Sequence, residues 1–328
     1  MERRVSMADV AAAAGVSGQT VSRVVNDSPR VDPATRARVE RAMTELGYRP
    51  HRAARALRTG RTHTIGLLAS TLATVGNSRM LQALADAAAT RGYALTVVTL
   101  GAEPDVAAAF ERLSEQGVDG TVVLNEATAA VRDASLDRGA RLVVVDSPPD
   151  DRFAIVQTAH ASGARAAVEH LLALGHETVH HVGGPSDSYA AAERERGWRE
   201  ALRDAGRTVP DVARGDWGAA SGAVVATELA RGGATAVFCA NDQMALGVLG
   251  GLADLGLDVP RDVSVVGFDD VADAAHYRPP LTTVRQDFDG LAERAVARLV
   301  HAIETGETGG TEVVEPALVV RRSTGPVG

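Results

Sequence analysis

Residues 6–26 read SMADVAAAAGVSGQTVSRVVN, and this stretch decides the fold of the first part of the chain. Ser6 is a good helix N-cap, so residues 7–14 are predicted to form a short helix. Gly15 supplies a turn, and a second helix is predicted over 18–26. Two short helices joined by a tight turn at a glycine are typical of a helix-turn-helix motif.

The second helix of this motif carries the candidate DNA contacts. In a helix-turn-helix, the second helix lies in the major groove and its N-terminal residues touch base edges. Glutamine suits adenine and arginine suits guanine, because each can make a bidentate pair with that base. The predicted DNA-contacting residues of this helix are Gln19, Thr20, Ser22, Arg23 and Asn26. Val21, Val24 and Val25 fall on the opposite face, which is expected to point inward.

A third helix is predicted to complete the N-terminal unit. Asp32-Pro33 combines an N-cap with a proline at the first helical position. Val39, Met43 and Leu46 recur at helical spacing and are expected to form its apolar face. Three helices of this size give a head with a small hydrophobic core.

Charge divides the chain into a basic head and an acidic body. The whole chain has 328 residues and a formal net charge of -8. Residues 1–62 hold 12 Arg against 6 acidic residues, a net charge of +6, so the remainder has a net charge of -14. A basic head can approach a polyanion such as DNA, while an acidic body avoids indiscriminate DNA binding.

The length, the distribution of apolar residues and the number of cysteines exclude several classes of protein. The length predicts two or three domains. No run of 18 apolar residues is present, and the polar start of the chain does not resemble a signal peptide, so a cytoplasmic protein is expected. Cys239 is the single cysteine, which excludes an internal disulfide and a multi-thiolate metal site. No metal and no other cofactor is predicted.

From residue 64 onward, short apolar runs alternate with helical stretches, which predicts parallel sheets covered by helices on both faces. Two such series predict two doubly wound α/β lobes. The predicted strands are 64–69, 94–100, 119–124, 141–146, 178–182, 235–239 and 263–267. The predicted helices are 77–91, 104–116, 128–138, 161–174, 189–205, 219–231 and 241–255.

Residues that directly follow these strands are candidates for ligand binding. Open α/β sheets bind ligands at the carboxyl ends of their strands, and two facing lobes form a cleft there. Polar side chains at these places can form hydrogen bonds to sugar hydroxyls. The candidates are Ser70 and Thr71, Asp146, Asn241-Asp242 and Asp269-Asp270.

The segments ADVAAAAGVS (8–17), QTVSRVVN (19–26) and RVDPATRARVERAMTELGYRP (30–50) together resemble the lac-repressor (LacI) family of transcription regulators. The resemblance covers almost the whole chain. It implies that the two lobes are of the periplasmic-binding-protein type. It also implies that the chain near 289–316 returns from the second lobe to the first. The expected partners are double-stranded operator DNA, a small sugar or glycoside effector and a second copy of the chain, without a membrane.

The linker PHRAARALRTG (50–60) resembles the family's hinge helix, which becomes ordered on operator DNA. By this resemblance, Leu57 is a wedge between base pairs in the minor groove, where it kinks the duplex. Arg52 adds to the DNA contacts, and Ala54 is small enough for two hinge helices to approach each other. The alternative interpretation is a solvated basic linker.

The resemblance also assigns pocket residues in the body. Arg194 stands at the position of the family's ligand-clamping arginine, and Trp217 where the family's namesake stacks an aromatic ring on its sugar. The further pocket residues that it implies are Asp146, Asn241, Asp269, Gln286 and Phe288. The alternative for Trp217 and Phe288 is core packing, and for Asp269 a helix cap.

Four positions depart from the pattern of the family's namesake. Gly18 replaces a tyrosine at the start of the recognition helix, so the operator preference can differ. Thr74 and Val75 at the rim of the first lobe lack matching side chains, and Thr158 stands where a pocket aromatic is expected. The sugar is therefore not fixed as a galactoside. No leucine heptad follows RRSTG (321–325), which favours a dimer over a tetramer.

Three other functions compete with this interpretation. An enzyme is disfavoured, because His180 and His181 point to opposite faces of a strand near His176 and are poor partners for one metal. A secreted sugar-binding protein is disfavoured by the basic head. A purine-dependent co-repressor stays open, although Trp217 favours a sugar.

The sequence thus predicts a dimeric, sugar-released repressor on a pseudo-palindromic operator. Its expected domains are a helix-turn-helix domain (1–49), a hinge (50–62) and a two-lobed body (63–328). The first lobe is expected over about 63–156 and 289–316, and the second over about 157–288 and 317–328.

Overall fold

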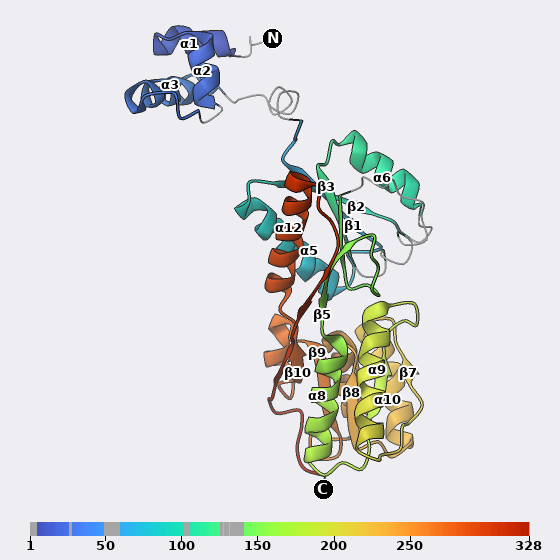
Figure 1. Ribbon diagram of the computed structural model, residues 1–328. Coiled ribbons are helices and arrows are strands. Elements are labelled where there is room, and N and C mark those ends of the chain that lie inside the picture. Colours follow the sequence, from blue (N-terminus) through green and yellow to red (C-terminus); the bar gives the residue numbers. More distant parts are fainter. Residues whose placement is uncertain are drawn as a thin grey trace. The chain divides into compact units, whose positions relative to one another are not determined.

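The computed structural model describes residues 5–25, 28–48, 60–101, 105–124, 127, 131 and 141–327. The chain forms two compact units, Met1–His63 and Thr64–Gly328 (Figure 1). The first is a three-helix head, and the second is a larger α/β body.

The head contains α1 (Met7–Ala14), α2 (Gly18–Val25) and α3 (Pro33–Glu45), which confirms the predicted helix-turn-helix followed by a third helix. Ser6 and Asp9 form a capping box, in which the Ser6 amide donates to the Asp9 carboxylate at 2.8 Å. The side chains of Val10, Val21 and Val39 form the fully buried centre of this unit. The hydrophobic effect of these few side chains holds the three helices together.

The prediction that Leu46 belongs to the apolar face of the third helix is wrong. Leu46 is 37% exposed, whereas Ala42 is 5% exposed and occupies the expected place beside Val39. α3 ends at Glu45, and Leu46 is its C-cap residue. The inward face of α3 therefore consists of Val39, Ala42 and the partly buried Met43.

The body is built on two sheets, each with six strands among the described residues. The first has the order β11-β5-β4-β3-β1-β2, and the second β12-β10-β9-β8-β6-β7. All pairs are parallel except β10 with β12, which confirms the predicted two-lobed α/β body. The strands of the first sheet are β1 (Thr64–Ala69), β2 (Ala94–Thr99), β3 (Gly120–Leu124), β4 (Leu142–Val145), β5 (Ala154–Thr158) and β11 (Thr311–Val314). Those of the second are β6 (His180–Gly183), β7 (Ala213–Arg214), β8 (Ala236–Cys239), β9 (Ser264–Asp269), β10 (Thr282–Arg285) and β12 (Ala317–Val319).

Helices cover both faces of each sheet (Figure 1). On the first sheet, α5 and α12 pack on one face and α6 on the other. On the second, α8 and α9 pack on one face and α10 and α11 on the other. The first-sheet helices are α5 (Val75–Thr90), α6 (Val106–Glu115) and α12 (Phe288–Thr305). The second-sheet helices are α8 (His160–Ala173), α9 (Tyr189–Asp204), α10 (Ala219–Arg231) and α11 (Asp242–Asp254). Most of the helix predicted over 128–138 lies outside the described residues.

The chain crosses between the sheets three times. It passes from β5 to α8, returns from β10 to α12, and passes again from β11 to β12. These crossovers lie side by side, because β11 pairs with β5 and β12 pairs with β10. Three adjacent crossovers make a narrow connection, and the two lobes can move relative to each other about it.

Candidate functional site

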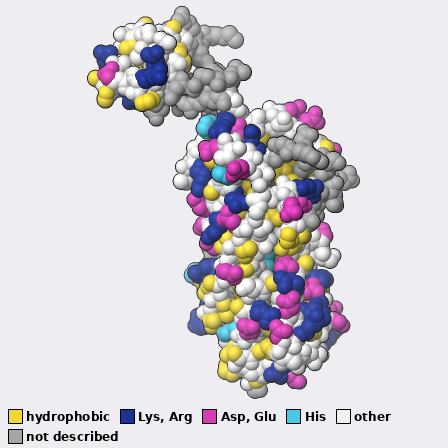
Figure 2. All heavy atoms as spheres, in the orientation of Figure 1, with side chains coloured by type: hydrophobic (Ala, Val, Ile, Leu, Met, Phe, Trp, Pro, Cys, Tyr) yellow, Lys and Arg dark blue, Asp and Glu magenta, His cyan; other side chains and the backbone are white. Residues whose placement is uncertain are grey.

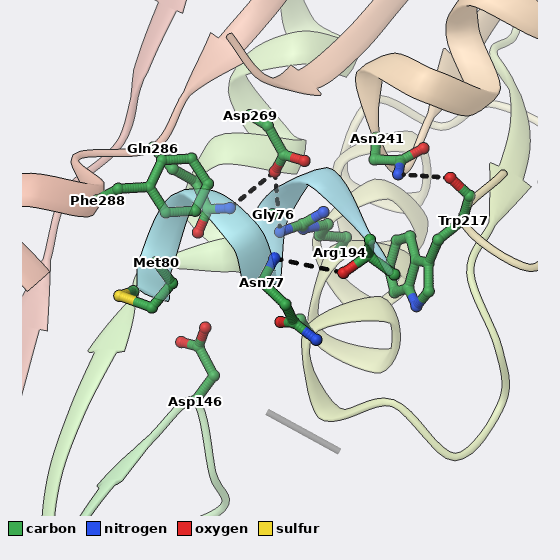
Figure 3. A pocket seen from close by; sticks show the side chains of 12 residues that line it. Gly76, Asn77, Met80, Asp146, Arg194, Trp217, Asn241, Asp269, Gln286 and Phe288 are labelled. Carbon is green, nitrogen blue, oxygen red and sulfur yellow. Dashed lines mark hydrogen bonds and ion pairs between the residues drawn. The ribbon is translucent and has the colours of Figure 1, made fainter. Parts of the chain in front are cut away.

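A cleft between the two lobes of the body holds about 500 Å³ of free space, part of which is open to solvent. The residues that line it are Thr74, Gly76, Asn77, Met80, Asp146, Ala190, Arg194, Trp217, Asn241, Asp269, Gln286 and Phe288. Figure 3 shows that side chains from both lobes surround this space. Every pocket residue implied by the family resemblance lines it, whereas the strand-end candidates Ser70, Thr71, Asp242 and Asp270 do not. The Ser70 carbonyl accepts a hydrogen bond from the Gly101 amide at 3.2 Å.

Topology places the cleft at the carboxyl ends of strands. Asp146 follows β4, and Asp269 is the last residue of β9. Helix N-termini meet at the same place: Asn241 caps α11, and Phe288 opens α12 directly after its cap. The positive ends of these helix dipoles favour polar, electron-rich ligand groups.

Arg194 is the best-anchored side chain of the cleft. It projects from α9 and is almost fully buried. Its Nη2 lies 3.5 Å from Oδ1 of Asp269, and its Nη1 donates to the carbonyl of Ala240. The guanidinium also covers the ring of Phe268, with Cζ 3.8 Å from the ring centroid. These contacts hold the guanidinium fork in one orientation, as a ligand clamp requires.

Asp269 and Gln286 form a second fixed pair. Nε2 of Gln286 donates to Oδ1 of Asp269 at 2.7 Å (Figure 3). Burial raises the pKa of the Asp269 carboxyl, although the nearby Arg194 and Gln286 favour its charged form. Asp269 does not cap a helix, because the short 3₁₀ helix Ala272–His276 that follows begins after Val271. The geometry thus favours a role in the cleft over the alternative of a helix cap.

Asp146 contacts residues at both ends of the first crossover, which leads from β5 to α8. Its Oδ1 accepts from the Thr158 amide at 3.0 Å and lies 3.0 Å from Nε2 of His160. Nδ1 of His160 lies 3.3 Å from Nε of Arg194, which can only donate. Nδ1 of His160 is therefore the acceptor of this hydrogen bond. The His160 ring thus links a carboxylate of the first lobe to the arginine of the second.

Two aromatic side chains supply apolar surface. The carbonyl of Trp217 accepts from Nδ2 of Asn241 at 3.0 Å, and Gly184 gives space for its ring, which a Cβ there would meet. Phe288 lines the cleft but also packs in the core of the first lobe. Core packing therefore accounts for part of the position of Phe288. Trp217 is only half-buried, which leaves more of it for a ligand.

Backbone strain is concentrated in the cleft. Asp146, Trp217 and Asp269 have φ values of 56°, 73° and 114° without being glycines. Such conformations cost about 1–3 kcal/mol each and are typical of residues that function fixes in place.

Several residues that line the cleft were not predicted from the sequence. Gly76, Asn77 and Met80 belong to the first turns of α5, and Ala190 belongs to α9. On a helix, apolar residues at this spacing usually belong to the core, and Asn77 is not part of any recognisable sequence motif. Thr74 lies at the rim as predicted, but Val75 is 41% exposed and does not line the cleft.

The candidate DNA contacts lie on α2. Gln19 and Arg23 are exposed, and Thr20 and Ser22 are half-buried. Val21 and Val24 are buried on the opposite face, as predicted, whereas Val25 is only partly buried. Ser17 holds the start of α2, because its Oγ accepts from the Thr20 amide at 3.1 Å. The other predicted contacts lie outside the described residues, namely Asn26, Arg52, Ala54 and Leu57.

The histidines near β6 have structural partners. The His176 ring lies within 3.1 Å of both the Thr235 and the Ser264 hydroxyl, and His181 is fully buried. Within the described part of the chain, no cluster of three His, Cys, Asp or Glu side chains is placed to hold a metal ion. None of the described helices is both long and apolar enough to span a membrane.

Comparison with known proteins shows the family. Residues 6–51 match the model for bacterial regulatory proteins of the lacI family, and residues 168–324 match a periplasmic binding protein-like domain. The lactose operon repressor of Escherichia coli (strain K12) is 37% identical, over 98% of this chain and 91% of that repressor. The chain belongs to the LacI family. As a LacI-family member it is a DNA-binding transcriptional repressor, and the resemblance inferred from residues 8–50 is confirmed.

Solved structures extend the LacI-family likeness to the whole fold. The lac repressor dimer bound to operator and the anti-inducer ONPF superimposes with a TM-score of 0.87 at 35% identity, over 98% of this chain and all of that one. A complex of the transcriptional regulator CelR with cellobiose gives a TM-score of 0.69 at 34% identity, over 98% of this chain and all of that one.

Proposed function

We propose that the chain acts as a dimeric repressor that binds a pseudo-palindromic operator and releases it when a small sugar or glycoside binds between the lobes. The observation that carries this proposal is the composition of the cleft. Two carboxylates, one arginine and three amides meet there beside a tryptophan and a phenylalanine. Carboxylates, Arg and amides form paired hydrogen bonds to vicinal hydroxyls, and aromatic rings cover the apolar face of a pyranose.

Relatives support the sugar class without fixing the sugar. One related structure holds cellobiose, and another holds ONPF on a lac repressor bound to operator. These relatives favour a glycoside as the effector of this chain, without singling out one compound. A purine that tightens DNA binding is the competing outcome.

In the proposed mechanism, Gln19 and Arg23 read base edges in the major groove, and Thr20 and Ser22 support them. One head occupies each half-site, and the hinge over 50–62 joins the helix-turn-helix domain (1–49) to the body (63–328). Arg52, Ala54 and Leu57 of that hinge remain predicted minor-groove contacts. Sugar in the cleft stabilises one arrangement of the lobes, which weakens the operator-bound state by a coupling energy of about 1–3 kcal/mol.

The test compares two arginines on α9. Arg194→Ala should leave operator binding without sugar nearly unchanged and abolish release by sugar, because the ligand clamp is lost. Arg196→Ala is the matched control, since Arg196 is half-exposed, pairs with Glu193 and Glu200, and does not line the cleft. Fluorescence anisotropy of labelled operator measures both properties. If the sugar concentrations that release the wild type from the operator also released the Arg194→Ala protein, the assignment of Arg194 as the ligand clamp would be contradicted.

A further inference from the structure

Thr158 lies at the point where the chain first leaves the first lobe. It is the last residue of β5, and it is 3% exposed. Its hydroxyl Oγ1 lies 2.8 Å from Oε1 of Gln286, which lies on the second crossover between β10 and α12. Thr158 itself is not among the residues that line the cleft, whereas Gln286 is. One hydrogen bond thus joins two crossovers directly behind the pocket wall.

The direction of each hydrogen bond fixes the Gln286 amide. A carbonyl oxygen can only accept, so the Thr158 hydroxyl donates to Oε1. Nε2 of Gln286 donates at the other end to Oδ1 of Asp269, at 2.7 Å. The two bonds require the same orientation of the amide, so the edge that Gln286 presents to the cleft has one defined pattern of donor and acceptor.

Thr158 is itself held in place. Its backbone amide donates to Oδ1 of Asp146 at 3.0 Å. A continuous chain of hydrogen bonds therefore runs from Asp146 through Thr158 and Gln286 to Asp269. It connects the carboxylate after β4 in the first lobe with the carboxylate at the end of β9 in the second. Such a connected network restricts the side chains more than isolated pairs do.

We propose that Thr158 is a positioning residue that makes the cleft selective for the stereochemistry of a sugar hydroxyl, by fixing Gln286. The inference rests on the proposed function of the cleft as a sugar site. A hydroxyl with the matching orientation pairs with the fixed amide, whereas its epimer leaves a buried polar group unpaired. Discrimination of this kind depends on the rigidity of the protein group as much as on its identity.

The test compares Thr158→Val with Thr158→Ser in the full-length protein. Valine keeps the shape of the side chain but removes the donor, and serine keeps the donor. The probes are the o-nitrophenyl β-glycosides of glucose, galactose and mannose, of which the last two differ from the first at one ring carbon each. Isothermal titration calorimetry gives the affinity of each glycoside.

The wild type is expected to prefer one glycoside. Thr158→Val should reduce that preference by roughly threefold to tenfold, as expected for the loss of one buried hydrogen bond. Thr158→Ser should retain it.

Two results would overturn the inference while leaving the sugar site intact. One is an unchanged preference in Thr158→Val, and the other is an equal loss of affinity for every glycoside, which indicates a purely structural role. Failure of the wild type to bind any of the three glycosides is a different result, because it contradicts both the proposed sugar class and the selectivity built on it.

Discussion

His181 shows how one buried side chain can link stability to pH. Its ring is fully buried between Trp198 and Phe238, with ring centroids 5.2 Å and 4.9 Å away. Its Nδ1 lies 2.9 Å from the carbonyl of Phe238 and must donate to it. Nε2 has no hydrogen-bond partner among the described residues. Burial lowers the pKa of His181 to about 4, and the smaller opposing effects of the Phe238 carbonyl and of Glu195 do not offset it.

We therefore expect acid to destabilise the body through His181. The unfolded chain takes up a proton near pH 6.5, whereas the folded state resists it down to about pH 4. The stabilisation is complete above pH 6.5 and is lost as the pH falls through this window, by up to roughly 3 kcal/mol. Urea unfolding at pH 7.5 and pH 5 measures the loss. In His181→Asn, whose amide can still donate to Phe238, the loss should be smaller. An equal loss in both proteins would refute this role.

At the level of single residues, the sequence predicts strand-end polar groups better than helix-borne ones. Asp146, Asn241 and Asp269 follow strands, and parallel strands end at one edge of a sheet. Gly76 and Asn77 are different, because they lie on a helix, and which of its faces meets the cleft depends on how the lobes pack. Ser70 follows a strand as well, but it does not line the cleft.

Among the elements, α10 and α11 are joined by close backbone contact. A Cβ on Gly222 of α10 would collide with the carbonyl of Met244, and one on Gly247 of α11 with the carbonyl of Ala219. These glycines therefore allow the two helices to approach closely. The contact also sets the position of Asn241, which caps α11 and bonds the Trp217 carbonyl. Gly222 and Gly247 thus serve helix packing.

Gly247→Ala should lower the free energy of unfolding by about 1–3 kcal/mol, because the methyl group forces the helices apart. The matched control is Gly250→Ala in the same helix, where a Cβ meets nothing within 4 Å. That substitution should be neutral or stabilise by up to about 1 kcal/mol, because alanine favours the helix. Chemical denaturation of the three proteins makes the comparison. A Gly247→Ala protein as stable as Gly250→Ala would show that the helix contact is loose.

Capped helices and central strands of the sheets were predictable, whereas most elements next to the crossovers were not. α9 and α10 begin within one residue of their predicted starts, because caps and apolar spacing mark them. The strands β5, β7, β10, β11 and β12 and the helix α12 were not among the predicted elements. β10 reads TTVR, and its pairing with β9 and β12 rather than its own composition stabilises it. Four of these strands, β5, β10, β11 and β12, adjoin the crossovers between the lobes.

For the whole molecule, the two lobes of the body meet around the cleft. The Tyr189 hydroxyl of α9 lies 3.2 Å from Oε1 of Gln157 in β5. A Cβ on Gly76 of α5 would lie 3.8 Å from Oδ2 of Asp269. The first turn of α5 therefore lies close to the end of β9 across the cleft. Figure 2 shows basic and acidic side chains interspersed on the visible surface of the body, and many of them are paired, as Arg196 is with Glu193 and Glu200.

A larger side chain at Gly76 should hold the lobes apart. Gly76→Leu is expected to weaken glycoside binding by about tenfold or more, which corresponds to about 1.4 kcal/mol. Gly76→Ala is the control, because its methyl group fits at ordinary van der Waals distance and should bind nearly as the wild type. Calorimetric titration with the preferred glycoside compares the three proteins. A Gly76→Leu protein that binds the glycoside with wild-type affinity would contradict the role of this close approach of the lobes in glycoside binding.

The most direct test of the central proposal is a DNA-binding titration at fixed salt concentration. The DNA is the region upstream of the gene itself, with unrelated DNA of equal length as control, and a panel of galactosides, glucosides and free purines is added in turn. We predict specific binding that one glycoside weakens by about 5- to 150-fold. Specific binding that no sugar weakens would contradict a sugar-released repressor, and tightening by a purine would replace it with co-repression.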